Sequence, residues 1–525
     1  MIDLREVRSA PRVTVVLTTW DTPGGRAALR SALRQTYSNL EIIVAGGGQG
    51  DAECAAGLAD PRVRRLRRPA QGGEAASLNE ALRRAEGRYV CYLDDRSQFY
   101  GDHVRVLVEA LETGGDGEAA YSDFYCTLQG PAAERGRQVL GKVLLGGRDF
   151  DRFFLFHYHY VPRAALMHRR DLLERTGPYA EEPGDLLDWD MHRRMALFTD
   201  FVHVPRITGE ISADDEPDAA APPAVGAPAA DERLEAALLA VRRRRPGKPW
   251  PKARDLAVVF APSRADADAA ARIAEIHRWT YVPYRLYLAA APDEARRLGA
   301  AGPELVHVPV EAGWPWDARV DKALRLGEAD CVAVLPPDGD VDAAGIEACA
   351  YVLEHHAEPG QAVRLPSASG AWGAVFRTDE LLRARRNHPA LSLRRSVEAA
   401  GLATRSPRGD ELPFDFDQAL RDARAAEADG NFLRAARTYE ALARKRGNTL
   451  WMKEAAACAL YRDEQHDPQA LEACQEVNRH RPTVSSLLLE ARLCRRNDQV
   501  PRAARLLEQA REVLTGTADV KEPPC

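Results

Sequence analysis

The chain has 525 residues, enough for about three or four domains, and its 45% hydrophobic and 29% charged residues are ordinary for a globular protein. A formal net charge of -6 excludes a chain-wide basic surface that would recruit nucleic acid. The nine cysteines form no C-x-x-C pair, and no stretch has the roughly eighteen apolar residues of a membrane helix. These features predict a cytoplasmic protein without a transmembrane segment, a disulfide framework or a zinc site.

Strand and helix patterns alternate through the N-terminal part of the chain. Apolar runs rich in Val predict strands, and runs with apolar residues at i, i+3, i+4 and i+7 predict helices. The expected strands are 12–18, 40–45, 63–66 and 89–93, and the expected helices are 24–34, 74–85 and the pattern HVRVLVEALE. This alternation predicts an α/β fold with a mostly parallel, doubly wound sheet, which binds ligands at the carboxyl ends of its strands.

The stretch GRYVCYLDDRSQFYGDHV is the most informative of these segments. Its apolar strand ends abruptly in Asp94 and Asp95, so two carboxylates lie at the sheet edge where open α/β sheets bind ligands. Adjacent carboxylates suit a hard cation and, through it, a diphosphate. The alternative is that both residues cap the following helix or solvate a turn.

Several blocks of sequence carry a resemblance to a known family. They are QTYSNLEIIV, NEALRRAEGRYVCYLDD, AYSDFY, LMHRRDLLERTGPY, LLDWDMHRRMAL and FVHVP. In this order and spacing, residues 1–211 resemble a family 2 glycosyltransferase of the GT-A fold. The resemblance implies a nucleotide-diphosphate sugar as the donor substrate.

The resemblance also implies roles for two acids. Asp94 corresponds to the residue that helps to hold the ribose and the metal-diphosphate, and Asp188 corresponds to the general base on the acceptor hydroxyl. The base has a physical reason, because an alcohol attacks an anomeric carbon poorly unless its proton is removed as the bond forms. The alternative for Asp188 is a helix N-terminal acid that is favoured by the helix dipole.

Further donor-site residues are expected beside these acids. A metal, Mn²⁺ or Mg²⁺, is expected to bind weakly or not at all, through Asp95 and His203, and a structural role is the alternative for that histidine. The residues expected to contact the nucleotide and the diphosphate are Thr18, Thr19, Trp20, Asn79, Asp94, Asp95 and Arg96.

Aromatic residues supply the acceptor candidates. His157 and His159 belong to the run HYHY, and Trp189 follows the expected base. These side chains could line an acceptor pocket, since sugars stack on aromatic faces. A half-buried strand with alternating side chains explains HYHY equally well.

The departures from the family pattern concern the donor site. Gly46 and Gly47 stand where the family usually has an Asp that grips the nucleoside, Arg96 and Ser97 replace further acids, and Leu187 replaces a Glu before the base. The metal site is therefore eroded. One repair is that the Arg96 guanidinium binds the diphosphate in place of a metal, and the alternative is a solvent-exposed loop charge.

The middle of the chain contains a linker and an internal repeat. Residues 212–252 comprise an Ala/Pro-rich linker, a short helix and the basic run RRRRPGKPWPK, which we interpret as a solvated junction. Beyond it, SLNEALRRAEGRYVCYL aligns with RVDKALRLGEADCVAVL without gaps, VTVVLTTW aligns with LAVVFAPS, and MHRRDLL resembles FRTDELL. Residues 253–408 are therefore expected to form a second, shortened GT-A-like domain, and an unrelated α/β domain is the alternative.

The C-terminal part, residues 409–516, is Ala- and Arg-rich and helical, and a tail of residues 517–525 follows. Ala435, Ala470 and Ala503 recur close to the roughly 34-residue period of tetratricopeptide repeats, and the motif around Phe432 resembles one such repeat. Stacked helix pairs of this kind present a concave surface for a protein segment or another subunit. A plain helical bundle is the alternative.

Together these features predict a family 2-like glycosyltransferase with an inverting mechanism and an Asp general base. The expected partners are a nucleotide sugar, a protein or glycan acceptor, and a protein partner or second copy bound through the C-terminal repeats, without nucleic acid. Both protein glycosylation and polysaccharide biosynthesis fit. The contrasting hypothesis is a pseudoenzyme, in which a GT-A scaffold without turnover acts as an adaptor through its helical repeats.

Overall fold

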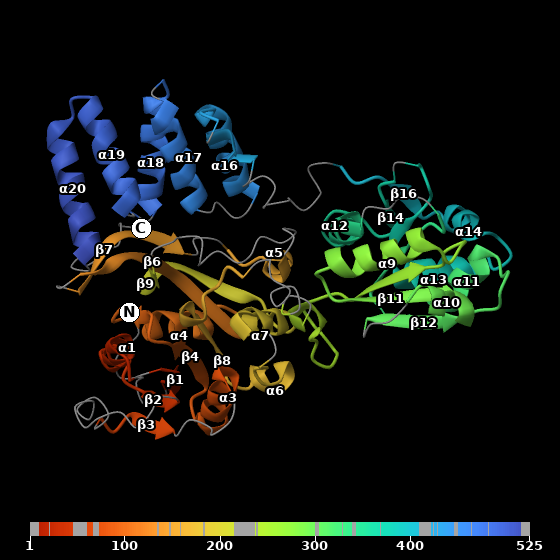
Figure 1. Ribbon diagram of the computed structural model, residues 1–525, viewed down its shortest axis with the longest axis horizontal. Helices are drawn as coiled ribbons and strands as arrows, with labels where there is room; N and C mark the ends of the chain where they lie inside the picture. The colour runs from red at the N-terminus through yellow and green to blue at the C-terminus, as the bar shows by residue number, and fades with distance from the viewer. Residues whose placement is uncertain are drawn as a thin grey trace. The chain divides into compact units, whose positions relative to one another are not determined.

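The computed structural model divides the chain into two compact units (Figure 1). Unit 1 comprises Met1–Ala227 and Asp415–Cys525, and unit 2 comprises Pro228–Phe414. The structure describes residues 10–19, 21–45, 60–66, 73–133, 136–145, 149–157, 159–181, 184–214, 237, 240–299, 304–327, 329–338, 343–367, 369–408, 422–423, 425–427, 429–445, 450–463, 465–480, 482 and 484–515.

Unit 1 is built on a mixed sheet with the strand order β3-β2-β1-β4-β8-β6-β9-β5, and β7 pairs with β6 beside this path. β1, β2, β3 and β4 are parallel, β8 is antiparallel to both β4 and β6, and β9 is parallel to β6. The strands are β1 (Val13–Leu17), β2 (Leu40–Ala45), β3 (Val63–Leu66), β4 (Tyr89–Leu93), β5 (Ser97–Phe99), β6 (Ala119–Ala133), β7 (Gly136–Leu145), β8 (Leu166–Arg169) and β9 (Phe201–Asp214).

Helices cover this sheet because they carry apolar residues on one side. The central strands β1, β2 and β4 are buried along their whole length, as expected for parallel strands with both faces covered. The helical elements of the N-terminal part of unit 1 are α1 (Pro23–Leu33), α3 (Glu74–Arg84), α4 (His103–Thr113), α5 (Arg152–His157), η3 (Arg163–Ala165), α6 (Leu172–Thr176), η4 (Gly184–Leu186) and α7 (Leu187–Ala196). The α/β fold predicted from the sequence is therefore present, but the prediction of a mostly parallel sheet is wrong, because β5, β7 and β8 pair antiparallel with their neighbours.

Unit 2 contains a second mixed sheet with the strand order β12-β11-β10-β13-β15-β14-β16. Its strands are β10 (Leu256–Phe260), β11 (Tyr284–Ala290), β12 (Leu305–Pro309), β13 (Cys331–Val334), β14 (Gln361–Arg364), β15 (Ala374–Arg377) and β16 (Ala403–Arg405). Its helices are α9 (Ala267–Trp279), α10 (Pro292–Arg297), α11 (Trp316–Leu324), α12 (Ala343–His355), α13 (Thr378–Asn387) and α14 (Leu393–Ala399).

The two sheets share one topology. If β5 and β7 are left out of unit 1, its strands follow the spatial order 3-2-1-4-6-5-7 in chain numbering, and the strands of unit 2 follow the same order. In both units the sixth strand is antiparallel to its two neighbours and the seventh is parallel to the fifth. The segments that align within the sequence also occupy equivalent elements: β1 with β10, α3 and β4 with α11 and β13, and β8 with β15.

The basic run of residues 242–252 folds onto unit 2. The Arg242 guanidinium lies 3.7 Å from the centre of the Tyr281 ring, and Lys248 lies 2.5 Å from a carboxylate oxygen of Asp255. Arg243 pairs with Glu304 at 3.3 Å. Arg243 and Lys248 are therefore paired with carboxylates of unit 2, and Arg242 lies on an aromatic ring, where we had expected a solvated junction.

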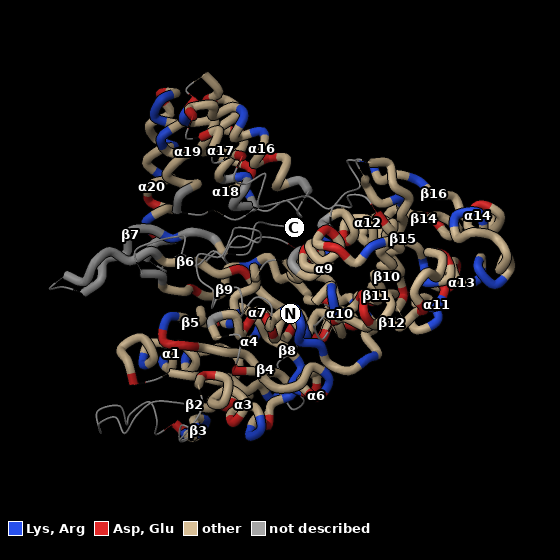
Figure 2. Tube along the Cα trace, turned by 45° about the vertical axis from the view of Figure 1, so that its right-hand side comes forward, with Lys and Arg blue, Asp and Glu red and all other residues tan. Residues whose placement is uncertain are grey.

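The C-terminal region consists of helices that pack one after another in chain order. They are α16 (Phe432–Lys445), α17 (Leu450–Asp463), α18 (Asp467–His480), α19 (Val484–Arg496) and α20 (Val500–Thr515), with acidic and basic residues interspersed along them (Figure 2). Ala435, Ala470 and Ala503 are all buried, so small side chains occur where the helices approach one another. Within unit 1, α19 packs on β7, and the Tyr125 hydroxyl donates to the Pro482 carbonyl at 3.3 Å.

Among the described residues, no helix is both long and apolar enough to span a bilayer.

Candidate active site

The candidate site lies where the chain leaves the two central strands of unit 1. From β1 the chain runs to β2 and β3 on one side, and from β4 it runs to the strands on the other side. Such a switch in direction opens a crevice at the carboxyl ends of the strands. Thr18 follows β1 and donates its backbone N–H to the Leu93 carbonyl at 3.2 Å, so the two strand ends are held together. Asp94 is the next residue of the chain after β4.

Asp94 uses one carboxylate oxygen to shape its own turn. Its Oδ1 accepts hydrogen bonds from the Ser97 hydroxyl at 2.6 Å and from the Arg96 backbone N–H at 3.0 Å. The Ser97 hydroxyl in turn accepts from the Asp94 backbone N–H at 3.0 Å. Ser97, which replaces an acid of the family pattern, therefore orients Asp94.

Asp95 is joined to the start of α1. Its Oδ2 accepts from the Thr22 hydroxyl at 3.2 Å, and the same hydroxyl accepts from the Gly25 N–H at 3.0 Å as the N-cap of the helix. Gly24 permits this approach, because a Cβ there would lie 1.9 Å from the Asp95 carbonyl oxygen. The N-terminal end of α1, with its positive partial charge, therefore lies beside the turn that carries Asp94 and Asp95.

A buried arginine connects the acids of the site. Arg163 begins η3, which packs on β4, and its side chain is only 7% exposed. One guanidinium nitrogen donates to Asp188 Oδ1 at 2.9 Å, and another donates to Glu74 Oε1 at 2.5 Å and lies 3.9 Å from Asp94 Oδ2. Because a guanidinium stays charged and holds its donors in a fixed fork, Arg163 sets the positions of three carboxylates.

Asp188 is the second residue of α7, and its side chain keeps 24% of its surface exposed. Burial raises the pKa of Asp188 above its usual value, the ion pair with Arg163 opposes this, and the nearby Asp94 carboxylate adds to it. The net effect is that the pKa of Asp188 is raised. A carboxylate with a raised pKa that is open to solvent is suited to accept a proton.

The rest of α7 is anchored in the fold. The Trp189 indole N–H donates to the Leu155 carbonyl at 2.7 Å, which joins α7 to α5. Arg194 donates to Asp190 at 2.6 Å within the helix and to the Thr176 carbonyl at 2.6 Å, which joins α7 to α6. Asp188 therefore lies on a helix that is hydrogen bonded to both α5 and α6.

Arg96 lies on the exposed side of the same turn. Its backbone carbonyl accepts from the Ser212 N–H at 2.8 Å, and its charge is close enough to lower the pKa of Asp188 slightly against the effect of burial. No hydrogen bond or ion pair of its side chain is found within the part of the chain that the structure describes. The guanidinium is therefore available to an anionic ligand.

Among the described residues, few carboxylate oxygens at this edge are free to bind a divalent cation. One oxygen each of Asp94 and Asp95 is already hydrogen bonded, and the second Asp94 oxygen faces the Arg163 guanidinium. A hard cation takes about six oxygen ligands, of which water and a diphosphate can supply several, and guanidinium groups nearby repel it. No group of three or more ligating side chains occurs among the described residues.

Two of the predicted donor-site residues have structural contacts. Asn79 Nδ2 donates to the Tyr179 carbonyl at 2.8 Å and its Oδ1 accepts from the Tyr179 N–H at 2.9 Å, so its amide holds α3 to the segment before η4. The Thr18 side chain is largely buried at the end of β1. Thr19 is partly exposed beside it, and Trp20 is outside the described residues, as are Gly46 and Gly47.

The acceptor candidates are dispersed. His157 is the last residue of α5 and its Nδ1 hydrogen bonds to the Phe153 carbonyl at 2.7 Å, so the alternative of a strand at HYHY is wrong. Burial lowers the pKa of His159 to about 4, and its ring lies 5.2 Å from that of His192. Trp189 is 2% exposed, so a sugar has no face of this indole to stack on.

His203 lies on β9 and contacts two carboxylates. Its Nε2 is 2.9 Å from Asp123 and its Nδ1 is 3.0 Å from Asp149, and its ring stacks on Tyr121 at 4.9 Å. Both ring nitrogens are therefore engaged within the protein, which leaves neither for a metal in this arrangement.

Comparison with known proteins identifies the domain around this site. Residues 26–176 match the profile of Glycosyl transferase family 2. This segment is a glycosyltransferase family 2 domain. It contains α3, the Asp94–Asp95 turn and Arg163, and it ends shortly before α7.

Individual relatives are similar over parts of their length. The putative colanic acid biosynthesis glycosyl transferase WcaA of Escherichia coli (strain K12) is 26% identical over 19% of this chain and 38% of its own length. The succinoglycan biosynthesis protein ExoO of Rhizobium meliloti (strain 1021) is 28% identical over 21% of this chain and 32% of its own. The chain thus spans about a third of these curated relatives.

A solved structure, S. aureus TarS 1-349 in complex with UDP, is 11% identical and covers 38% of this chain and 60% of its own, with a TM-score of 0.31.

Arg163, which joins the acids of the candidate site, is a residue that the sequence alone did not reveal. It lies in the run VPRAALM, where a single arginine interrupts small and apolar residues ahead of a buried strand. A lone charge in such a context needs a partner, which is the signal that could have marked it.

Proposed function

We propose that unit 1 transfers a sugar from a nucleotide-diphosphate donor to a hydroxyl group of a glycan or protein acceptor, with inversion and with Asp188 as the base. The observation that carries this proposal is the placement of Asp188. It is partly open to solvent, has a raised pKa, and is joined through Arg163 to the Asp94 turn at the carboxyl ends of β1 and β4. The family 2 profile over residues 26–176 supports the same chemistry.

The transfer is a single displacement. As the acceptor oxygen forms its bond to the anomeric carbon, its proton passes to the Asp188 carboxylate. The bond between the anomeric carbon and the diphosphate oxygen breaks, and its electron pair leaves with the diphosphate. Arg96, whose side chain is exposed at the same turn, supplies positive charge for the departing group. Inversion requires Asp188 on the side of the anomeric carbon opposite the leaving group, and the hydrogen bond from Arg163 fixes the carboxylate.

The acceptor is a growing polysaccharide or a protein. Relatives named for colanic acid and succinoglycan biosynthesis favour a polysaccharide. A protein acceptor is favoured by the C-terminal helices, if α16–α20 are tetratricopeptide repeats, because buried alanines at a regular spacing and a serial packing order are typical of that array. A nucleotide sugar is the donor in either case.

Unit 2 is in our proposal a second GT-A-like domain. The shared strand order, and the position of each aligned segment on an equivalent element, support a duplicated architecture. Pro336 and Pro337 stand where unit 1 has Asp94 and Asp95, so this copy lacks the acids that serve transfer.

The experiment that tests this proposal replaces the carboxylate of Asp188 by an amide. In Asp188→Asn, donor-dependent release of UDP or GDP from a panel of UDP- and GDP-sugars should fall by about 10²–10⁴-fold, while binding of UDP and GDP stays near the parent value. Asp171→Asn is the matched control, because Asp171 is an exposed acid whose partner is Arg169. Equal activity in Asp188→Asn and the parent removes this residue from the mechanism.

A catalytically silent adaptor is the second candidate. It is favoured by the use of Asp94 Oδ1 within its own turn and by the ion pair that occupies Asp188. Failure of the parent to bind any nucleotide would support it against the transferase.

A further inference from the structure

A pocket of about 320 Å³ lies at the carboxyl end of β13 in unit 2, and β13 pairs with β10. These are the two central strands of the second sheet, from which the chain departs to opposite sides. Ligands of open α/β sheets bind at such a point, and the volume is at the lower end of the range of small-molecule pockets. The residues that matter here are Trp316, Asp317, Pro336, Asp338, Trp372 and Arg394.

In unit 1, the equivalent position holds the ion-paired side chains of Glu74, Asp94, Arg163 and Asp188. Trp316 is the first residue of α11, as Glu74 is the first residue of the equivalent α3. When MHRRDLL is aligned with FRTDELL, Trp372 falls on Arg163, because each stands four residues before the first residue of its motif. Two indoles therefore replace the ion pair between Glu74 and Arg163.

The positions of Asp94 and Asp188 also hold other residue types in unit 2. Arg394 is the second residue of α14, and Asp188 is the second residue of α7, which occupies the same interval between the sixth and seventh strands. Pro336 stands in place of Asp94. The unit 2 pocket therefore lies at the position equivalent to the unit 1 site. Arg394 stands in place of Asp188 and Pro336 in place of Asp94, and neither can take a proton from a sugar hydroxyl.

The two tryptophans form walls at a right angle. Their ring centres are 6.3 Å apart and their planes are inclined by 88°, and both side chains are partly exposed. Gly373 brings the Trp372 segment against the strand ends, because a Cβ there would lie 2.9 Å from Pro336 Cδ and from the Val334 carbonyl oxygen. The walls are thus fixed before any ligand arrives.

Asp317 joins the two helices α11 and α14, which both contribute residues to the pocket. Its Oδ1 accepts from the Leu393 N–H at 2.6 Å, which ties the start of α14 to the start of α11. Arg394 then extends from α14 at the rim, where its Nε lies 3.1 Å from Glu398. The Trp316 indole N–H is buried and has no hydrogen-bond partner among the described residues.

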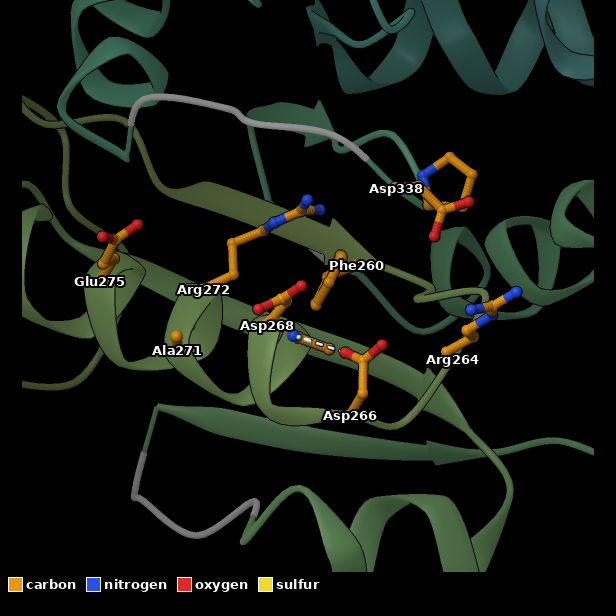
Figure 3. A pocket seen from close by; sticks show the side chains of 10 residues that line it. Phe260, Arg264, Asp266, Asp268, Ala271, Arg272, Glu275 and Asp338 are labelled. Atoms are coloured by element: carbon orange, nitrogen blue, oxygen red, sulfur yellow. Dashed lines mark hydrogen bonds between the residues drawn. The ribbon is translucent and has the colours of Figure 1, made fainter. Parts of the chain in front are cut away.

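A second, more polar pocket of about 410 Å³ adjoins the first and shares Pro337 and Asp338 with it (Figure 3). Figure 3 shows acidic and basic side chains from α9 and from the loop before it around this space. Its charged residues are Arg264, Asp266, Asp268, Arg272, Glu275 and Asp338. Acids outnumber bases here, and Asp317 and Asp338 outnumber Arg394 in the first pocket, so a diphosphate would be repelled.

We propose that the tryptophan pocket of unit 2 binds an uncharged saccharide. The C–H faces of a pyranose ring match the apolar faces of Trp316 and Trp372, and its hydroxyls need the acceptors and donors that Asp338 and Arg394 supply. The proposal concerns a binding site without transfer, and it stands whether or not unit 1 turns over.

The test is saturation-transfer NMR on the full chain with cellobiose, lactose, mannobiose and chitobiose, each at about 10 mM because binding of single sugars is weak. At least one disaccharide should receive saturation from the parent. In Trp372→Ala and Trp316→Ala its dissociation constant should rise by about tenfold or more, and Trp372→Phe, which keeps a ring, should bind between these values.

Trp314→Ala is the matched control, because Trp314 packs on the same core near Lys322 and does not line the pocket. It should bind as the parent does, and circular dichroism should show that all four variants are folded. Equal binding by the parent and both pocket alanine variants, or no binding of any disaccharide, overturns the proposal. Loss of UDP or GDP binding in Trp372→Ala would assign the pocket to a nucleotide.

Discussion

The guanidinium of Arg163 lies 2.9 Å from the Asp188 carboxylate, and this pair joins η3 to the first turn of α7. The cation favours the ionised form of Asp188 and also fixes where its carboxylate points. Both consequences can be separated by experiment, because one changes a pKa and the other changes a geometry.

Replacing Arg163 should change the pH dependence of transfer. Arg163 lowers the pKa of Asp188 against the effect of burial, so Arg163→Gln should raise that pKa further. The base must be ionised to act, so activity is lost as pH falls through this pKa and the acid limb of kcat/KM should move to higher pH. At neutral pH, kcat/KM should fall by about 10–10²-fold because the carboxylate is also misplaced.

Arg163→Lys should recover the position of the acid limb, because it keeps the charge, and only part of the rate. Arg175→Gln is the control, since Arg175 is an arginine nearer the surface whose partner is Glu118. An unchanged acid limb in Arg163→Gln would mean that the arginine acts on structure alone.

Nucleotide binding should depend on Arg96 and little on metal. Calorimetry with UDP and GDP should give similar affinities with EDTA, Mn²⁺ or Mg²⁺, because Asp94 and Asp95 lie among hydrogen bonds and guanidinium groups. In Arg96→Ala the affinity should fall by about tenfold or more, as expected for a charge-assisted hydrogen bond to phosphate. Arg105→Ala, which removes an arginine paired with Glu109 on α4, should bind normally. Strong dependence on metal in the parent would restore a cation site at Asp94 and Asp95.

Glu41 should make the stability of the unit 1 sheet depend on pH in the acid range. This residue of β2 is fully buried, and although burial opposes ionisation, hydrogen bonds from Thr14 and from the Glu86 and Gly87 N–H groups hold its pKa below its usual value of 4.5. Its stabilisation is therefore complete above pH 4.5 and is lost as pH falls through the lower, folded-state pKa.

In Glu41→Gln, the free energy of unfolding at pH 7 should be lower by about 1–3 kcal/mol, and the deficit should shrink in acid. Hydrogen exchange of β1 and β2 peptides in urea measures this locally. Glu86→Gln is the control, because Glu86 pairs with the same Arg12 and Arg64 and is exposed, so its effect should stay within about 0.5 kcal/mol. A deficit of Glu41→Gln that is constant with pH would contradict the assignment.

Asp498 offers a stabilising substitution in the C-terminal helices. It has φ of 56°, the one positive φ of a non-glycine residue in the described part of the chain, and it stands two residues before α20, as Gly430 stands two residues before α16. Glycine adopts this conformation without the steric cost of a side chain.

Asp498→Gly should stabilise the α19–α20 pair by about 0.5–1 kcal/mol, which appears as hydrogen exchange slowed by about twofold to fivefold. Asn497→Gly is the matched control and should speed exchange, because Asn497 has a negative φ and its side chain donates to the Leu493 carbonyl at 3.0 Å. Faster exchange in Asp498→Gly would show that the Asp side chain contributes more than its backbone strain costs.

The sequence predicted local features well. The strands at 40–45, 63–66 and 89–93 are present with those bounds, and the last of them is an unbroken apolar run that is buried along its whole length. Asp94 and Asp188 lie in one site because one follows a central strand and the other begins a helix that returns to the same edge. The gapless alignment of Ser77–Leu93 with Arg319–Leu335 also anticipated which elements of the two units correspond.

What the sequence did not disclose depends on contacts between distant segments. Arg163 gains its importance from Glu74, Asp94 and Asp188, which come from three other elements. Asn79 faces the backbone of Tyr179 and not a ligand, although its position in α3 suggested the reverse. The pattern HYHY fits a strand by alternation, but its first histidine ends a helix through the Phe153 carbonyl.

The division of unit 1 between the two ends of the chain fixes the order in which a ribosome supplies its parts. The sheet of unit 1 emerges first, the whole of Pro228–Phe414 is then made, and only afterwards are α17 and α19 made, which pack on β7. At about 5–20 residues per second this interval lasts roughly ten seconds or more. During that time β7 has no helix above it, so a nascent chain stalled within unit 2 displays a surface that the finished protein conceals.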